Sequence, residues 1–290
     1  MAVDPRTIIT VDVEEWFHGH NYLDLVPAEK WDGLESRVRQ GMDICLDLLG
    51  RHQVKATFFV LGWTAQRHPE VVRDILAAGH EVACHSYSHP VVYEMSEEEF
   101  RDDCLRAREA LNKAGAAGVV GYRAPSFSIT PAVHHYLKIL QDCGFSYDCS
   151  LFPVRHPRYG QPNSPRRPFR LGEGANSLVE VPMPTWRVLG QNIPFSGGGY
   201  LRILPWPAFK TLRGLAAGQG IPCIVYLHPW ELDSFKPQVG QSKSTSLRSQ
   251  GGQSTMPLKL ERILKQGEFE TLGQYVGRLR EADELPVRAV

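Results

Sequence analysis

The sequence predicts an α/β fold in which a parallel sheet or barrel is wrapped in helices. Runs of β-branched and aromatic residues alternate along the chain with segments whose apolar residues recur at helical spacing. This alternation is typical of parallel strands joined by helices. The chain has 290 residues, of which 42% are hydrophobic, so it can bury a core as one large domain or as two small ones. We expect one large domain over residues 1–290.

The first strand–helix–strand unit lies near the N-terminus. Residues Thr7–Val13 and 56–61 are rich in β-forming side chains. Between them, apolar residues recur at helical spacing: Val38, Met42, Cys45 and Leu49. A second helix is expected over residues 69–78, with Gly79 as its stop, and the apolar strand "HEVACH" follows it.

The next helix begins with a recognisable N-terminal signal. Ser96 and Glu99 have the spacing of a capping box, and the helix should run to about Lys113. After the strand "GVVGY", another helix is expected from Thr130 and Pro131 to Gly144. The strand–helix pattern therefore repeats four times in the first half of the chain.

The second half has a different character. Prolines are frequent over residues 151–207, "SGGGY" interrupts, and only "SLVEV" looks like a strand, so we expect an elaborated loop or hairpin region. Alternation resumes with a helix near residues 208–217 and the strand "CIVYL". Residues 234–256 contain almost nothing apolar and are expected to form a mobile loop. A closing helix is expected near Leu272 and Val276.

Charge and cysteine content exclude several classes of function. Thirty-two basic residues balance 32 acidic ones without a Lys/Arg stripe, so we expect no nucleic-acid partner. The chain has no apolar stretch typical of a signal region and none approaching the roughly 20 residues that span a bilayer, so we expect a cytoplasmic protein without a transmembrane segment. Six cysteines without Cys-x-x-Cys spacing are typical of reduced core thiols.

Two carboxylates share one face at the end of the first strand. In "TVDVEE" the side chains alternate, so Asp12 and Glu14 point the same way. The C-terminal ends of parallel strands are where active sites form in barrels and open sheets. The alternative is that these acidic residues only cap the following turn.

Basic groups follow three other predicted strands. In "CHSYSHP", His85 and His89 are four residues apart and can bind one metal ion if the segment turns helically. Alone, this spacing is also typical of histidines with satisfied hydrogen bonds. Arg123 in "GYRAPSF" and His228 in "YLHPWELD" hold the same position after their strands, which places all these groups at one rim.

In this order, the motifs resemble the polysaccharide deacetylases, also called carbohydrate esterase family 4 or the NodB-homology family. The resemblance extends from about Thr7 to Asp233. It implies a distorted, incomplete (β/α) barrel with an elaborated C-terminal region. It also implies an enzyme that removes acetyl groups from an N-acetylated sugar or glycan precursor, using one divalent metal, usually Zn²⁺.

The resemblance also assigns roles to matching residues. It implies these metal ligands: Glu14, His85 and His89. Asp12 would be the general base, oriented by Arg123, and His228 the general acid. Asp148 in "YDCSLFP" would fix Arg123, and the backbone N–H of Ser126 would stabilise the oxyanion.

One departure from the family pattern keeps other functions open. Val13 replaces the aspartate that is normally the metal ligand; alternation returns Glu14 to the face of Asp12, and Glu15 is the alternative ligand. Imidase- or allantoinase-like branches similarly carry Asp-x-Asp or Asp-x-Glu, so a cyclic imide or ureide is an alternative substrate. A catalytically inactive carbohydrate-binding relative is a second alternative, but it would not need the full catalytic set.

The stretches "FSGGGYLRILPW" and "HPWELD" resemble a subgroup with an added C-terminal region, often encoded near exopolysaccharide assembly genes. Gly198 would let the backbone approach a ligand closely, although a tight turn explains the glycines equally well. Tyr200 and Trp230 could stack on sugar faces, although such aromatics more often pack at the rim. We favour Trp230 because it follows His228 and Pro229 directly.

Overall fold

The chain folds around one nine-stranded sheet with the strand order β10-β1-β2-β3-β4-β5-β7-β6-β11. The computed structural model describes residues 6–19, 22, 25–174, 176–237, 239, 251–283 and 285–288. Neighbouring strands are parallel except for the antiparallel pair β6 and β7. Within the described residues the edge strands β10 and β11 pair with no further strand of this sheet, so the expected barrel-like α/β fold is confirmed with open edges.

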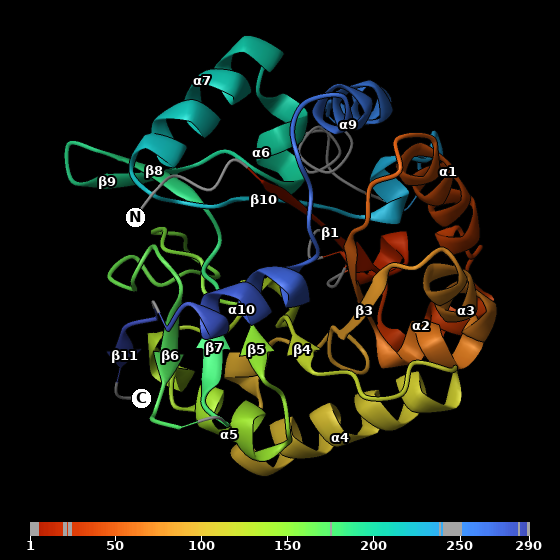
Figure 1. Cartoon of the computed structure of the whole chain (residues 1–290). Helices are drawn as coiled ribbons and strands as arrows, with labels where there is room; N and C mark the ends of the chain where they lie inside the picture. The colour runs from red at the N-terminus through yellow and green to blue at the C-terminus, as the bar shows by residue number, and fades with distance from the viewer. Residues whose placement is uncertain are drawn as a thin grey trace.

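The strands of the sheet are short, apart from the first. They are β1 (Thr7–Val13), β2 (Thr57–Val60), β3 (Glu81–Cys84), β4 (Gly121–Tyr122), β5 (Tyr147–Asp148), β6 (Phe169–Leu171), β7 (Leu178–Glu180), β10 (Cys223–Leu227) and β11 (Val287–Arg288). A separate hairpin joins β8 (Thr185–Val188) to β9 (Gln191–Pro194). Figure 1 shows this hairpin beside α7, away from the first strands.

Helices pack on both faces of the sheet (Figure 1). They are α1 (Val38–Arg51), α2 (Gly62–Arg67), α3 (Pro69–Ala77), α4 (Glu97–Lys113), α5 (Tyr136–Asp142), α6 (Gly198–Ile203), α7 (Trp206–Gly218), α9 (Met256–Leu264) and α10 (Leu272–Glu281). The predicted capping box of α4 is confirmed: the Glu99 N–H donates to Ser96 Oγ, and the Ser96 N–H donates to Glu99 Oε2 at 2.7 Å.

Alternation along β1 divides the core into two clusters. Ile9, Val11 and Val13 pack with side chains of α1, α3, α4, α5, α7 and α9 on one face of the sheet. Ile8 packs on the other face with residues of α10. Thr10 and Asp12 share the face of Ile8, so the sequence periodicity itself directs the carboxylate of Asp12 to the face opposite to the first cluster.

The structure differs from the sequence expectations mainly in the second half. Residues 151–207 contain β6, β7, the β8–β9 hairpin and α6, where only one strand was expected. The helix expected from Thr130 to Gly144 is divided into a 3₁₀ turn, Pro131–Val133, and α5.

The segment expected to be a mobile loop is ordered at its C-terminal end. Residues 238 and 240–250 lie outside the described residues. Gln253–Thr255 form a 3₁₀ helix, and Met256 begins α9 and is fully buried. The amide of Gln253 donates hydrogen bonds to the carbonyls of Trp230 and Asp233, which ties this end to the loop after β10. Tertiary contacts therefore order residues whose composition predicts a loop.

A glycine sets the position of that loop. A Cβ atom on Gly41 of α1 would lie 2.3 Å from the carbonyl oxygen of Pro229, so only glycine permits this close approach. Pro229 follows His228 directly. The close contact between α1 and the chain after β10 therefore fixes where His228 enters the site.

Candidate active site

Most of the predicted site residues line a cavity of about 710 Å³ at the C-terminal ends of the central strands. The residues that line it include Asp12, Glu14, His85, His89, Ser126, Gly198, His228 and Trp230. They come from the ends of β1, β3 and β10, from the turn after β4, from the first residue of α6 and from the 3₁₀ helix Pro229–Glu231. The chain thus brings together residues that are more than 200 positions apart.

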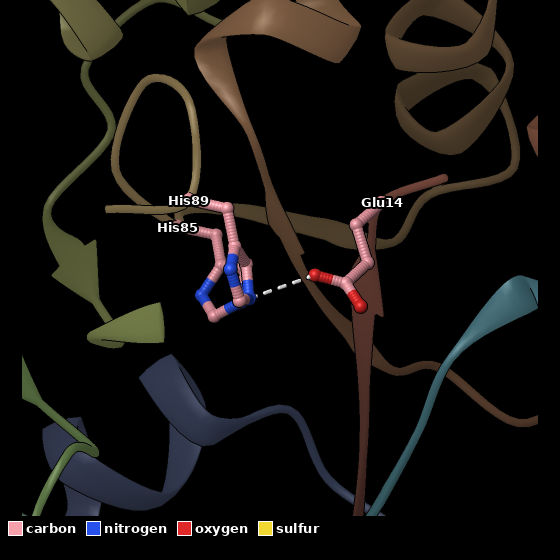
Figure 2. A group of neighbouring side chains, drawn as sticks. All are labelled: Glu14, His85 and His89. Atoms are coloured by element: carbon pink, nitrogen blue, oxygen red, sulfur yellow. Dashed lines mark ion pairs between the residues drawn. The ribbon is translucent and has the colours of Figure 1, made fainter. Parts of the chain in front are cut away.

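Glu14, His85 and His89 form one cluster of metal-ligand types. Each offers one ligand atom, and these atoms lie within 4.8 Å of one another. All three side chains are buried, and Nε2 of His89 lies 3.0 Å from Oε2 of Glu14. Figure 2 shows the two imidazoles side by side, facing the carboxylate across the site.

The imidazole of His85 is held in the orientation that a metal ligand needs. Its Nδ1–H donates to the backbone carbonyl of Arg123 at 2.8 Å, which leaves the lone pair on Nε2. Burial lowers the pKa of His85 to about 4, so the ring is neutral at physiological pH. One carboxylate and two imidazoles are donors that suit a divalent metal ion.

The segment between the two histidines is not helical, although a helical turn was the condition expected for both to bind one metal ion. Ser86 has a φ of 71° and His89 a φ of 62°, both in the left-handed region that non-glycine residues rarely adopt. These two residues fold the chain back so that both imidazoles face Glu14. Backbone strain of this kind is often found at functional sites.

The alternative metal ligand, Glu15, points away from the two histidines. Its carboxylate accepts hydrogen bonds from the hydroxyl of Ser36 and from the backbone N–H of Arg37, the latter at 2.8 Å. Burial raises the pKa of Glu15. Of the two glutamates, the structure places only Glu14 with the histidines.

Asp12 is paired with a completely buried arginine. Nη1 of Arg123 donates to Oδ1 of Asp12 at 2.7 Å and to Oγ1 of Thr10 at 2.9 Å. The guanidinium also donates to Sγ of Cys149 at 3.2 Å and lies over the ring of Phe59, 4.1 Å from its centroid. The predicted Asp12–Arg123 contact is therefore present, and Arg123 has a fixed orientation.

The predicted role of Asp148 is wrong. Its carboxylate accepts hydrogen bonds from the hydroxyl and N–H of Ser150, at 2.6 and 3.2 Å, and faces Glu180 across the β5–β7 pair. Alternation along β5 explains this: Tyr147 and Cys149 share the face of Arg123, whereas Asp148 points to the opposite face. Cys149 and Thr10, not Asp148, hold the arginine.

Asp148 and Glu180 instead form a buried carboxyl pair. Burial and the negative charge of Asp148 raise the pKa of Glu180 well above its usual range, so the pair retains a proton. The Ser150 hydroxyl that donates to Asp148 also accepts the N–H of Ala124 at 2.7 Å. Asp148 therefore contacts the turn after Arg123 only through Ser150.

His228 lies on the other side of the cavity, held by an acidic partner. Its Nδ1–H donates to Oε2 of Glu231 at 3.0 Å, and its Nε2 lies 3.8 Å from Oε1 of Glu14. The other carboxylate oxygen of Glu231 lies 3.1 Å from Nη1 of Arg202, which is also buried. Burial alone would lower the pKa of His228, but Glu231, Glu14 and Asp12 raise it to about 9.

Sequence reasoning missed two functional contacts here. Glu231 was given no role, although its position three residues after His228 is a usable signal for a local hydrogen bond. Arg202 was missed entirely, because nothing in the local sequence indicates that α6 packs against the loop after β10.

His18 is a third residue without a predicted role. Its ring is stacked with that of His89, with centroids 6.4 Å apart and an interplanar angle of 9°. It packs against Trp31 and Trp63, and its Nδ1 accepts the N–H of Glu15 at 3.2 Å. Burial lowers the pKa of His18 to about 3, so a neutral, closely packed imidazole supports His89.

The residues predicted to bind substrate have different positions. Ser126 lines the cavity and has a φ of 53°, again in the left-handed region. Trp230 also lines it, stacks on His228 with centroids 4.9 Å apart, and donates its indole N–H to Glu14 at 3.3 Å. Trp230 therefore helps to position the two sides of the site, besides exposing a partly accessible ring.

The glycine turn and Tyr200 differ from the expectation. Gly198 lines the cavity, but a Cβ on it would lie 2.5 Å from the hydroxyl of Tyr226, so the missing side chain makes room for this ring. Tyr200 is not among the lining residues; its hydroxyl lies 3.2 Å from that of Tyr159, which does line the cavity.

Comparison with known proteins agrees with this geometry. Residues 32–147 match the family model described as polysaccharide deacetylase, and residues 149–277 match a domain of unknown function, DUF3473. The chain carries a polysaccharide deacetylase domain. His85, His89 and Arg123 lie in the deacetylase match, whereas His228 lies in the second match and Asp12 precedes both.

Curated relatives match the deacetylase domain over short stretches. The peptidoglycan-N-acetylglucosamine deacetylase of Bacillus cereus (strain ATCC 14579) is 41% identical over 86 residues, which is 30% of this chain and 29% of the relative. The chitooligosaccharide deacetylase of Bradyrhizobium sp. (strain ANU 289) is 42% identical over 69 residues, which is 24% and 32% of the two chains. The matches thus span less than a third of each relative's own length.

A solved structure resembles the whole fold. A Mycobacterium smegmatis protein assigned to the polysaccharide deacetylases is 23% identical, with a TM-score of 0.64 over 99% of this chain and 94% of that chain. This likeness supports the fold of the deacetylase domain and of the strands that follow it. No helix within the described residues is long and apolar enough to cross a membrane.

Proposed function

We propose that the protein hydrolyses an N-acetyl group on an N-acetylated sugar or glycan precursor in a metal-dependent reaction that releases acetate. The observation that carries the proposal is the convergence of three metal-ligand types, a paired aspartate and a charged histidine around one cavity. The deacetylase domain and the names of the two curated relatives support the same reaction class.

The metal would be held by Glu14, His85 and His89, and we propose that it is zinc. This donor set suits zinc, and the neutral state of His85 leaves its Nε2 lone pair available. When bound, a divalent cation supplies Lewis acidity toward the acetyl carbonyl oxygen and makes water more acidic. Trp230 fixes the carboxylate of Glu14 from the side of His228.

Asp12 would act as the general base. Its carboxylate lines the cavity beside the metal-ligand cluster and takes the proton of the attacking water. Arg123 orients the carboxylate through a hydrogen bond and opposite charge. Because Arg123 is itself fixed by Thr10 and Cys149, the base has little freedom to turn away from the cavity.

His228 would act as the general acid. The water oxygen adds to the acetyl carbonyl, the C–N bond breaks, and His228 gives its proton to the leaving sugar nitrogen; the products are acetate and a free amine. Glu231 holds the ring of His228 through Nδ1, which directs Nε2 toward the cavity. Ser126 lies at the cavity wall, where its backbone N–H would donate to the developing oxyanion.

An assay of acetate release tests the proposal and separates it from the alternative reactions. The zinc-supplemented protein should release acetate from N-acetylglucosamine oligomers or from smaller N-acetylated sugar precursors, and the His228→Ala variant should release little. No acetate from any sugar, together with opening of a cyclic imide or ureide, would overturn the proposal in favour of a ring-opening amidohydrolase. A cytoplasmic location and a role in exopolysaccharide biosynthesis stay predictions.

A further inference from the structure

A second cavity, with a volume of about 830 Å³, has a strongly basic wall. It shares no lining residue with the active-site cavity. Four arginines line it: Arg166, Arg167, Arg187 and Arg288. They come from the loop before β6, from β8 and from β11, and within the described part of the chain no aspartate or glutamate lines this cavity.

The C-terminal end of α7 gathers three of these arginines. The side-chain oxygen of Gln219 accepts hydrogen bonds from Nη2 of Arg166 at 2.6 Å and from the backbone N–H of Arg187 at 3.2 Å. The backbone carbonyl of Gln219 accepts from Nη2 of Arg167 at 2.7 Å. The side-chain amide of Gln219 in turn donates to the carbonyl of Arg187 at 2.9 Å. One half-buried glutamine thus fixes the basic wall.

The positive charge of this wall is not balanced by carboxylates. The structure gives none of the four arginines an ion pair among the described residues, whereas Arg37, for example, lies 2.8 Å from Asp233. Burial lowers the pKa of Arg166, and the neighbouring charges of Arg187 and Arg167 lower it further. Arginines held together in this way repel one another, and an anion between them would relieve the repulsion.

We propose that this cavity binds a ligand through a phosphoryl group. Guanidinium groups have a planar set of donors that matches phosphate oxygens, and several of them can share one dianion. The volume lies within the range of small-molecule sites and leaves room for more than the phosphoryl group. The group can belong to free phosphate or to a phosphate ester of a sugar. This proposal does not depend on the hydrolytic reaction.

Binding can be measured by calorimetric titration of the zinc-loaded protein with inorganic phosphate and, separately, with glucose 1-phosphate, which carries no acetyl group. The test variant is R187A/R288A, which removes two exposed guanidiniums and none of the side-chain contacts of Gln219. The charge-matched control is R73A/R262A, which removes two exposed arginines outside both cavities.

We expect at least one probe to bind the wild type and the control equally, and the test variant at least about tenfold more weakly, because charged hydrogen bonds are lost. Affinity should also fall as salt is added. The better-binding probe identifies free phosphate or the sugar ester as the source. Binding of neither probe, or equal binding by R187A/R288A, contradicts the proposal. Loss of binding in an R158A variant alone would assign the anion to the active-site cavity and also contradict it.

Discussion

The two sides of the active site are built in different ways. The first side carries the proposed metal ligands and the proposed base, at the ends of β1, β3 and β4. Strand alternation directs Asp12, whereas the left-handed residues Ser86 and His89 turn the imidazoles toward the cavity. The second side carries the proposed general acid, His228, with Glu231 and Arg202. It depends on a contact between α6 and the loop after β10. The two sides meet at Glu14, which contacts both His89 and His228.

The two sides differ in whether a side chain is positioned by its own strand or by contacts with distant segments. On the first side, strand periodicity sets the direction of Asp12, so a change at this residue should affect one chemical step. Residues on the second side hold one another across the fold, so a change there should affect both positioning and stability. Variants on the two sides should therefore differ in whether they change turnover alone or turnover and stability together.

On the first side, the Asp12→Asn variant should lose turnover by about 10²–10⁴-fold, the usual contribution of a general base. The amide is nearly the same size as the carboxylate, so metal content should stay at the wild-type level. Kinetics of acetate release beside metal analysis would measure this. The exposed Asp102→Asn variant is the control. Full activity of Asp12→Asn would show that Asp12 is not the general base.

On the second side, the Glu231→Gln variant should lower kcat by roughly 10–100-fold, as is usual when a partner that orients a functional histidine is lost. Its KM should change little, because Glu231 acts through His228. The variant should also be less stable, since the buried ion pair between Glu231 and Arg202 is lost. A change in stability with unchanged kcat would make Glu231 purely structural.

The carboxyl pair behind the first side should affect stability without affecting chemistry. Because the pKa of Glu180 is raised above the ordinary value of 4.5, the folded protein keeps a proton that the unfolded chain releases. The stabilisation is complete below pH 4.5 and is lost as the pH rises toward the folded pKa, by at most about 1.4 kcal/mol per pH unit.

The Glu180→Gln variant cannot ionise, so its unfolding free energy should fall less between pH 5 and pH 8 than that of the wild type. Urea unfolding at several pH values would show this as diverging stability curves. Parallel curves would mean that the pair does not retain a proton. Acetate release by this variant should stay close to the wild-type level, because Glu180 does not line the cavity.

The smallest effect is expected from Asp148→Asn. The side chain touches Ser150 and faces Glu180 rather than Arg123, so turnover should remain near the wild-type value. A loss comparable to that of Asp12→Asn would restore Asp148 to the catalytic set. Steady-state kinetics of the two variants side by side would decide between these outcomes.

The first side of the site is easier to predict from sequence than the second, for a physical reason. Strand alternation by itself places Asp12 and Glu14 on one face, and the same rule excludes Asp148, which the motif resemblance includes. The left-handed residues Ser86 and His89 were not predicted, since φ values of non-glycine residues leave little trace in a sequence.

The fold shows the same division. Strand–helix alternation predicted β1 to β4 and most of their helices, because each unit carries its own periodicity. For residues 151–207 only a loop or hairpin region was expected, and the bounds of β8, β9 and α6 were not predicted. The helix α9 was not predicted either, because its residues are ordered by contacts with distant segments. Arg202 belongs to this group: its role exists only once α6 lies beside the loop after β10.

The central claim is that Glu14, together with the two histidines, holds the metal on which hydrolysis depends. The most direct test is metal content and acetate release of the wild type, Glu14→Ala and Glu15→Ala, each checked for its fold by circular dichroism. We expect one zinc ion in the wild type and in Glu15→Ala, and loss of both metal and acetate release in Glu14→Ala. Metal retained by Glu14→Ala, or lost only in Glu15→Ala, would contradict the account.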